Sequence, residues 1–377
     1  MQKESLNINS FAKLAGVSTT TVSNYINDTG SFPISKEKEE LLRKLMRQTG
    51  YRPNSSSTLI RRKKQLPPKG IFIYGDYVKL SSFHVIQNPT IIPLLDELSL
   101  QVKDKFGADL EVRSIADEDS LEQWNEVLIG AEFVINYGQL DPQLNKLCWR
   151  KNIPLILISA SHETRCRNGE TLPQHLDHVY WDNGVHLDMS IDFLRECGAT
   201  NILYISSVNV LENHPQYCST DAQARLDGFR NYLKCNQDIS GSTLIPHDTK
   251  EKLPEGAIFF WEQQNASQKL QLQPELLCGV DAIIGHNDFV ASGAVSALLL
   301  MGRRPGRDVL VIGEGNMREL AYHSPGITTV SVQFAKLVSE VCRILRSRMD
   351  GDDPQRGERI LVPGELIERE TTEKIST

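Results

Sequence analysis

The sequence lacks the features of a membrane or exported protein. None of its apolar runs approaches the roughly 20 residues that a bilayer-spanning helix needs. The first ten residues, MQKESLNINS, contain no apolar core of the kind found in a signal peptide. We therefore expect a cytoplasmic protein with no membrane partner.

Closely spaced cysteines and catalytic motifs are also missing. The seven cysteines lie far apart and none belongs to a CxxC pair, which predicts reduced, mostly buried thiols and no metal site. The chain contains no HExxH, GxSxG or Walker motif. These absences predict a protein that is not an enzyme and that holds no cofactor.

Positive charge is scarce overall but concentrated at one end. The chain of 377 residues carries a net charge of −7, whereas residues 1–68 hold 12 Lys and Arg against 5 Asp and Glu, a net charge of +7. The remainder therefore carries −14. A chain of this length usually forms two or three domains. A basic module on an acidic body suggests that only the first part meets a polyanion, although a solvated basic surface would give the same count.

A short polar stretch near the start, AGVSTTTVSNYIN, has helical spacing of its apolar residues. Val22, Tyr25 and Ile26 form one apolar stripe, which predicts a helix from about Thr19 to Asn27 with Ser18 as its N-cap. Another short helix precedes it, and a turn at Gly16 joins the two. Its predicted apolar face consists of Phe11, Ala12, Leu14 and Ala15. This is the pattern of a helix-turn-helix.

A third helix completes a predicted head over residues 1–52. Ser35 is a plausible N-cap and Gly50 a plausible stop. Its predicted core-facing residues are Leu41, Leu42, Leu45 and Met46.

The polar side of the second helix suits the major groove of DNA. Threonine can touch a thymine methyl group, and asparagine can form two hydrogen bonds to adenine, although a solvated face would also be polar. The following segment, SSSTLIRRKK, sets two apolar residues beside a basic run, as a minor-groove wedge requires. The candidate DNA contacts are Ser18, Thr19, Thr20, Thr21, Ser23, Asn24, Asn27, Tyr51, Asn54, Ser57, Leu59 and Ile60.

From Lys69 onward, short apolar runs alternate with helical patterns. This alternation predicts parallel sheets covered by helices on both faces, with enough material for two sheets. Ligands in such folds bind at the carboxyl ends of the strands. The predicted strands are 70–74, 109–115, 133–135, 153–158, 202–205, 257–260, 282–284 and 309–312, and a helix is predicted over 91–106.

The stretches AKLAGVSTTTVSNYIN and GYRPN resemble the head and hinge of the LacI family of bacterial transcription regulators. The resemblance extends over the whole chain. It implies a small all-α helix-turn-helix head, residues 1–52, and a hinge helix and linker, residues 53–68. An α/β periplasmic-binding-protein-like body of two lobes with parallel sheets would then span residues 69–377. The N-lobe would comprise about 69–197 and 330–357, and the C-lobe about 198–329 and 358–377.

The resemblance also implies a function. The protein would be a repressor that binds a palindromic double-stranded DNA operator as a homodimer. Two positions are informative. Asn24 stands where the family most often has arginine, which favours adenine over guanine in the operator. The wedge leucine of the family aligns with Ile60, and Leu59 precedes it, so either could insert.

The resemblance also implies a small-molecule effector, of a sugar-like kind, in the cleft between the lobes. ARLDGF matches the family's RxxGF motif, and in the family the residues matching Arg225 and Asn287 bind the effector. Arg225 could instead form an ion pair between the lobes, Asn287 could cap the following helix, and Trp261 could pack in the core. Gly315 replaces the usual sugar-binding aspartate. The effector candidates are Asp76, Asp182, Arg225, Trp261, Asn287, Glu314 and Asn316.

Two other functions fit parts of the sequence. A regulator of the same type could sense a protein partner or no ligand at all, which the Gly315 departure favours. A sugar-binding protein without a DNA role would need a signal peptide or a catalytic constellation, and the sequence shows neither.

Overall fold

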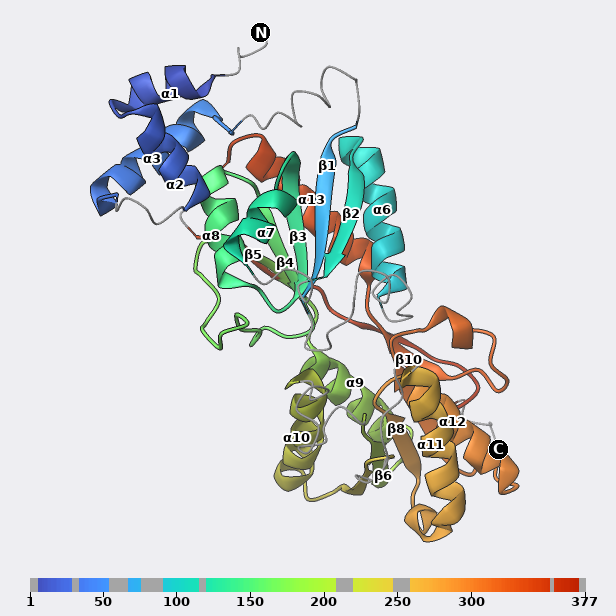
Figure 1. Cartoon of the computed structure of the whole chain (residues 1–377). Helices are drawn as coiled ribbons and strands as arrows, with labels where there is room; N and C mark the ends of the chain where they lie inside the picture. The colour runs from blue at the N-terminus through green and yellow to red at the C-terminus, as the bar shows by residue number, and fades with distance from the viewer. Residues whose placement is uncertain are drawn as a thin grey trace. The chain divides into compact units, whose positions relative to one another are not determined.

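The computed structural model describes residues 6–28, 34–53, 67–75, 91–114, 120–207, 220–246, 258–352 and 356–372. The chain forms two compact units (Figure 1). The first unit comprises Met1–Tyr180 and Phe334–Leu361, and the second comprises Trp181–Gln333 and Val362–Thr377. The first segment of the first unit ends at Tyr180, whereas the expected first boundary between the lobes is at about residue 197. The reason is that helix α9 (Asn183–Glu196) packs on α10 (Thr220–Cys235) and on strands of the second sheet.

The head consists of three short helices, α1 (Ile8–Ala15), α2 (Thr19–Asn27) and α3 (Lys36–Thr49). The predicted bounds and N-cap of α2 are confirmed. A small apolar core joins the helices, and its fully buried members include Phe11, Val22 and Leu42. Two predicted core residues are wrong: Leu14 is 54% exposed and Leu41 is 43% exposed, because each lies one position outside its helix's buried stripe.

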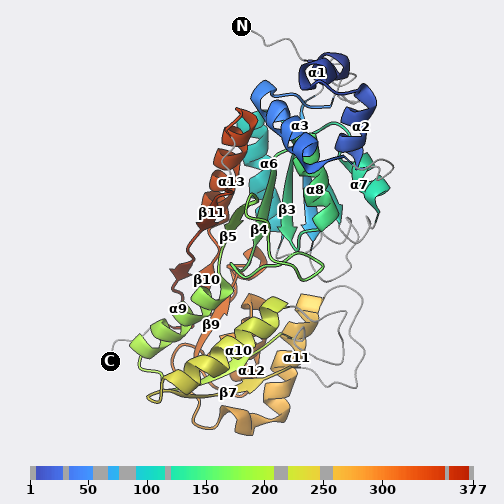
Figure 2. The same ribbon diagram turned by 90° about the vertical axis from the view of Figure 1, so that its left-hand side faces the viewer.

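The first sheet belongs to the first unit and is entirely parallel. Its strand order is β11-β5-β4-β3-β1-β2. Helices α6 and α13 pack together on one face, and α7 and α8 on the other (Figures 1 and 2). The strands are β1 (Lys69–Gly75), β2 (Asp109–Ser114), β3 (Ala131–Gly138), β4 (Leu155–Ser159), β5 (Asp177–Tyr180) and β11 (Arg359–Leu361); the helices are α6 (Ile92–Phe106), α7 (Leu121–Val127), α8 (Pro142–Lys151) and α13 (Phe334–Met349).

The second sheet belongs to the second unit and has the order β12-β10-β9-β8-β6-β7. All its pairs are parallel except β12 with β10. Helices α9 and α10 pack on one face, and α11 and α12 on the other (Figure 2). The strands are β6 (Asn201–Ile205), β7 (Ser240–Leu244), β8 (Ala282–Gly285), β9 (Leu310–Glu314), β10 (Thr328–Ser331) and β12 (Glu365–Ile367); the helices are α9, α10 (Thr220–Cys235), α11 (Ile258–Leu272) and α12 (Asp288–Leu300), with short 3₁₀ turns at Pro274–Leu277 and Arg318–Leu320.

The cores follow from the two-residue period of the strands. On β6, Ile202 and Tyr204 face α9 and α10, whereas Leu203 and Ile205 face α11 and α12. Both faces are therefore apolar, as continuous apolar runs predict. One predicted strand is wrong: the run 257–260 leads into α11, because a short apolar run fits a helix start as well as a strand.

The described cysteines match the prediction of reduced thiols. All six are free, and three of them, Cys148, Cys166 and Cys342, are buried. Burial raises the pKa of Cys148 to about 12, which keeps it a thiol at neutral pH. Cys235 and Cys278 are exposed, so the prediction of burial holds for only part of the set.

Candidate nucleic-acid interface and ligand site

Hydrogen-bonded caps fix the turn between α1 and α2. The Asn7 side chain caps α1, and Gly16 then adopts a left-handed backbone with a φ of 64°. The Ser18 hydroxyl accepts a hydrogen bond of 3.0 Å from the Thr21 backbone N–H, which starts α2. A glycine suits this turn because its left-handed conformation is costly for other residues. Together the caps set the orientation in which α2 presents its polar side.

The polar side of α2 lies open at its N-terminal end. Val22, Tyr25 and Ile26 point into the head core, while Thr19 and Thr20 are exposed. The remaining polar side chains are capping or half-buried: Ser18 bonds Thr21, Asn27 reaches Ser23 at 3.4 Å, and Asn24 is partly exposed. This arrangement offers hydroxyl and amide groups to a partner from a helix whose other side is anchored.

Tyr51 differs from the other candidate DNA contacts. Its ring is 4% exposed and stacks on Phe11, with 4.2 Å between the ring centroids. Burial raises its pKa. The structure therefore gives Tyr51 a packing role at the close of the head, and we leave it out of the proposed DNA face. The candidates Asn54, Ser57, Leu59 and Ile60 lie outside the described residues.

A second group of polar residues gathers in the second unit, where β6, β8 and β9 end. Arg225, from α10, is 5% exposed, and its NH1 donates a hydrogen bond of 2.5 Å to the backbone oxygen of His286. The same guanidinium forms an ion pair with Glu314, the last residue of β9. This ion pair lies within the second unit, whereas the predicted alternative for Arg225 is an ion pair between the lobes.

Glu314 is held from a second side by His186 of α9. The distance from His186 Nδ1 to Glu314 Oε1 is 2.9 Å, and the histidine is 1% exposed. Sequence reasoning did not find His186, because nothing in its local pattern on α9 indicates where its ring points. Glu314 therefore contacts both α9, through His186, and α10, through Arg225.

Glu262 forms the other half of the cluster. Its Oε1 accepts a hydrogen bond of 2.5 Å from the Ser207 hydroxyl, and its Oε2 lies 3.4 Å from the Asn287 amide nitrogen. The Asn287 side chain also accepts from the Val290 N–H and so caps α12. Trp261, the residue before Glu262, is partly exposed. Glu262 was not among the predicted site residues, because the start of its helix, α11, was predicted to be a strand.

Asp288 has a structural role. It is 2% exposed. Its Oδ1 accepts a hydrogen bond of 2.7 Å from the Thr329 hydroxyl, and its Oδ2 accepts one of 2.7 Å from the Met317 N–H. Burial outweighs these bonds and raises the pKa of Asp288 to about 6. Nearby, burial and the Arg225 charge lower the pKa of His286 well below its usual value, so its ring is neutral.

Two further effector candidates have other contacts. Asp182 caps α9 through the Gly184 and Val185 N–H groups. Asn316 has a left-handed backbone and accepts a hydrogen bond from Arg369 at 2.6 Å. Asp76 lies outside the described residues. The structure therefore brings together Arg225, Asn287 and Glu314, and joins to them His186 and Glu262.

Several buried polar atoms of the cluster have no hydrogen-bond partner among the described residues. They are Ser206 Oγ, His186 Nε2, Arg225 Nε and Glu314 Oε2, although the last of these faces the Arg225 guanidinium as an ion pair. Buried polar groups are usually satisfied by protein, water or ligand. The cluster thus retains hydrogen-bonding capacity that a small polar molecule could use.

Membrane-spanning helices and metal-binding clusters are both missing from the described part of the chain. No helix there has both the length and the apolar character to cross a membrane. No group of three His, Cys, Asp or Glu side chains among those residues is placed to hold a metal ion.

Taken together, the head and the sheets define a DNA-binding helix-turn-helix joined to a two-unit body of the kind that binds small molecules. Family models match both parts: residues 7–54 match bacterial regulatory proteins of the lacI family, and residues 191–372 match a periplasmic binding protein-like domain. The chain therefore belongs to the LacI family of bacterial regulatory proteins.

Its curated relatives are similar along their whole length. The HTH-type transcriptional repressor PurR of Haemophilus influenzae (strain PittEE) is 25% identical over 371 residues, which cover 98% of this chain and 99% of PurR. The HTH-type transcriptional regulator MalR of Clostridium butyricum is 22% identical, covering 97% and 99%. These relatives are named as transcription regulators, in agreement with the prediction that the chain is not an enzyme.

Solved structures show the same fold. The Lac repressor dimer bound to operator and the anti-inducer ONPF has a TM-score of 0.59 and 20% identity, covering 98% of this chain and 99% of that chain. The transcriptional regulator CelR in complex with cellobiose has a TM-score of 0.56 and 18% identity, covering 97% and 99%. The predicted fold class, a helix-turn-helix head on a periplasmic-binding-protein-like body, is confirmed.

Proposed function

We propose that this protein is a sequence-specific transcriptional repressor that reads an operator in the major groove with α2. The observation that carries the proposal is the pair of exposed threonines, Thr19 and Thr20, on a helix anchored by its opposite side. Short polar side chains at the N-terminal end of such a helix reach base edges. The curated PurR relatives, which carry the name of repressors, support the direction of regulation.

The charge distribution supports the same role. Residues 1–68 carry +7, whereas the rest of the chain carries −14, from the total of −7. DNA phosphates attract the first part and repel the second. The head would therefore meet the duplex while the body stays away from it. This role requires the compartment that holds the chromosome, the cytoplasm.

A homodimer on a palindromic operator is part of the proposal. A two-fold symmetric protein places two recognition helices one helical turn apart, about 34 Å, and so selects two matching half-sites. The similar Lac repressor structure is that of a dimer bound to operator. A wedge in the minor groove, by Leu59 or Ile60, would add a bend between the half-sites.

Footprinting on genomic fragments tests the DNA role. Thr19→Ala and Thr20→Ala should each weaken binding to a protected fragment about 5- to 150-fold, the cost of one lost base contact. Gln48→Ala is the matched control, because Gln48 is exposed on α3 of the same head. Unchanged binding by both threonine variants, or specific binding that survives deletion of residues 1–65, would refute the proposal.

We also propose that a small polar effector binds the cluster around Arg225 and that the effector is neutral and rich in hydroxyl groups, like a sugar. Arg225 is paired with one buried carboxylate, Glu314, and a second buried carboxylate, Glu262, accepts from the amide of Asn287, the residue after the His286 that Arg225 contacts. A second anion would meet repulsion there, whereas hydroxyl groups can donate to carboxylates and accept from Arg225. Similar structures in complex with cellobiose and lactose support this ligand class.

A thermal-shift screen tests the effector. A ligand at 100 times its Kd adds about 2.7 kcal/mol of stability. We expect a shift with a neutral saccharide and none with the matching sugar acid. Glu314→Gln should weaken the shift, whereas Glu275→Gln, on the exposed 3₁₀ turn of the same unit, should not. A panel of saccharides and nucleosides without any shift would favour a regulator that senses a protein partner or no ligand.

A further inference from the structure

Within the first unit, the head contacts the part built on the first sheet, here called the first lobe, through α8, the helix that follows β3. Two neighbouring residues at the end of α8, Trp149 and Arg150, reach different parts of the head. Helix α8 packs directly on α2, the proposed recognition helix. Figure 2 shows α8 close to the head helices α2 and α3. The contact therefore lies directly behind the proposed DNA-reading element.

Arg150 binds the C-terminal end of α2. Its NH1 donates to the Tyr25 backbone oxygen at 3.2 Å and to Asp28 Oδ1 at 2.5 Å, while its NH2 donates to Glu39 of α3 at 2.8 Å. The Arg150 side chain is only 12% exposed. Lys146 adds a second cation on Asp28 at 2.6 Å. Positive charge at a helix C-terminus is favourable, because the last carbonyl groups carry partial negative charge.

Trp149 binds α3. The guanidinium carbons of Arg43 and Arg47 lie 3.7 Å and 4.1 Å from the centroid of the Trp149 ring. The His175 ring packs against the same indole, with 3.7 Å between centroids. Burial and the two nearby arginines lower the pKa of His175 to about 4, so it adds no positive charge beside them. Both guanidinium groups lie over the indole at distances at which cation–π attraction is favourable.

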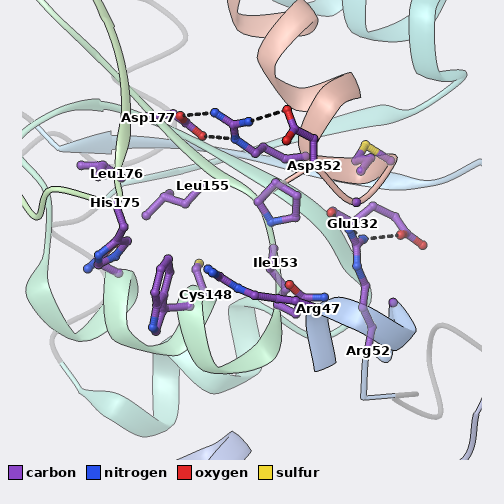
Figure 3. A pocket seen from close by; sticks show the side chains of 18 residues that line it. Arg47, Arg52, Glu132, Cys148, Ile153, Leu155, His175, Leu176, Asp177 and Asp352 are labelled. Carbon is purple, nitrogen blue, oxygen red and sulfur yellow. Dashed lines mark hydrogen bonds and ion pairs between the residues drawn. The ribbon is translucent and has the colours of Figure 1, made fainter. Parts of the chain in front are cut away.

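A third contact joins the end of the head to β3. Arg52 NH1 donates to the Glu132 backbone oxygen at 3.0 Å and to its carboxylate at 3.1 Å. Figure 3 shows Arg47 and Arg52 reaching from the head toward the lobe, with the Arg52–Glu132 pair marked. The head is thus attached at the end of α2, along α3 and at its own C-terminal residues.

These contacts leave the N-terminal end of α2 open. Thr19 and Thr20 remain exposed while Asp28, at the other end, is held by Arg150. The docked head can therefore still present its proposed base-reading residues. In this arrangement the lobe holds the recognition helix by one end and points the other outward.

The contact has the character of a separable interface. It is built mainly from ion pairs and cation–π contacts, and a cavity of about 340 Å³ remains between the two surfaces (Figure 3). Arg47, Gly50 and Arg52 of the head line this cavity, together with Trp149 and His175 of the lobe. Polar, incompletely packed surfaces are typical of domains that can separate.

We propose that α8 is a docking surface for the head and holds α2 in an orientation ready for DNA. Movement of the first lobe then reaches the recognition helix directly through Trp149 and Arg150, in addition to any path through residues 53–68. The occupant of the surface is the head itself, because its acidic residues Asp28 and Glu39 meet the lobe cations and its arginines meet the indole.

The docking part is tested without DNA, by ¹⁵N relaxation of the full-length protein. In the wild type, head amides should relax at the rates of the lobe amides. Arg150→Glu and Trp149→Ala should lower the transverse relaxation rates of head amides at least about twofold, as independent tumbling requires. Lys105→Glu makes the same charge change on the exposed surface of α6 and should have no effect.

A charge exchange separates lost docking from lost folding. Asp28→Arg and Glu39→Arg, combined with Lys146→Glu, should restore the relaxation rates of the Arg150→Glu variant, since all three ion pairs reform with opposite polarity. A wild-type head that already tumbles freely would overturn the proposal. So would an Arg150→Glu variant whose head still moves with the lobe.

The DNA part of this inference rests on the proposed function. Arg150→Glu should weaken operator binding about tenfold, because an undocked head must be oriented at the moment of binding. Restoration by the same charge exchange is expected. Unchanged or tighter binding by Arg150→Glu would contradict the ready orientation. The relaxation experiment is independent of any operator, so failure of the proposed function would leave the docking result standing.

Discussion

The two units of the body share one strand order and differ in the ion pair that each one buries. In the first unit, Arg348 forms a two-pronged pair with Asp177, at 2.9 and 2.8 Å, and the Glu358 N–H adds a further bond of 2.8 Å. In the second unit, Arg225 pairs with Glu314; apart from this ion pair, the buried atoms Arg225 Nε and Glu314 Oε2 have no hydrogen-bond partner among the described residues.

The first pair has a structural role, whereas the second is the pair that we propose contacts an effector. The Arg348 pair joins α13 to β5 and satisfies the Asp177 carboxylate, so it serves to hold the first unit together. The Arg225 pair is held by fewer bonds and leaves capacity for another molecule. Incomplete satisfaction of a buried polar cluster costs stability, and such clusters are expected where binding requires them.

The same contrast appears where equivalent strands end. Strand β4 of the first unit ends at Ser159, whose hydroxyl lies 2.7 Å from His178 Nε2. Strand β9 holds the corresponding place in the second unit and ends at Glu314. Burial and Arg359 lower the pKa of His178 to about 3, so the first network is built around a neutral imidazole. The shared topology fixes the position, whereas the side chains decide whether charge is present.

The largest expected effect comes from breaking the satisfied pair. Arg348→Met should lower the free energy of unfolding by about 3–5 kcal/mol, because it leaves the Asp177 carboxylate buried without its cation. Urea unfolding measures the change. Arg304→Met, which removes an exposed arginine from its pair with Asp308, is the matched control and should change stability little.

Breaking the unsatisfied pair should cost less. Arg225→Met should lower the free energy of unfolding by about 1–3 kcal/mol, because fewer bonds are lost and His186 remains beside Glu314. The same urea series measures it. A loss equal to or larger than that of Arg348→Met would break the distinction between the two pairs.

Acid should weaken the first unit through His178. Its folded pKa, about 3, lies below the value of 6.5 expected in the unfolded chain, so below pH 6.5 the unfolded state binds the extra proton. The contribution is complete above pH 6.5 and falls by up to about 1.4 kcal/mol per pH unit as the pH decreases. His178→Asn should flatten this slope in urea unfolding between pH 7 and 5. An unaltered slope would mean that His178 is not responsible.

Acid should act in the opposite direction on the second unit through Asp288. Its folded pKa, about 6, lies above its usual value of 3.8, so between these values the folded state binds the extra proton. This group therefore adds stability as the pH falls through 6, by at most about 1.4 kcal/mol per pH unit. Asp288→Asn should remove that gain, measured by hydrogen exchange of α12 amides at pH 7 and 5. The same gain in the variant would contradict the assignment.

The head could be predicted from the sequence almost residue by residue, because its signals are local. The N-cap Ser18, the apolar spacing of Val22, Tyr25 and Ile26, and the glycine after α3 each act within one or two turns. The errors at Leu14 and Leu41 are also informative. Helical spacing identifies a stripe, but not its edge, which depends on the angle at which neighbouring helices cross.

The apolar strands could be predicted, and so could the edge strand β2. Strands with five residues or fewer that read as polar or are very short were not predicted: β5, β7, β10, β11 and β12. Such strands exist because a neighbour supplies their hydrogen bonds, which no local pattern reveals.

The candidate ligand site was predictable only in part. Family motifs indicated Arg225 and Asn287, and the unusual residue after β9 indicated Glu314. His186 and Glu262 join them from α9 and α11, through packing that brings distant helices to one edge of a sheet. Contacts of this kind depend on tertiary structure, so the sequence offered no spacing that would reveal them.

Selection of bound sequences from random DNA tests the central claim most directly, namely that α2 reads bases. The wild type should enrich two half-sites related by two-fold symmetry. Asn24→Arg should change the preferred base at one position of each half-site, from adenine toward guanine. Two results would contradict base reading by α2. One is a pool without enrichment. The other is an enriched sequence that stays the same in all three variants, Asn24→Arg, Thr19→Ala and Thr20→Ala.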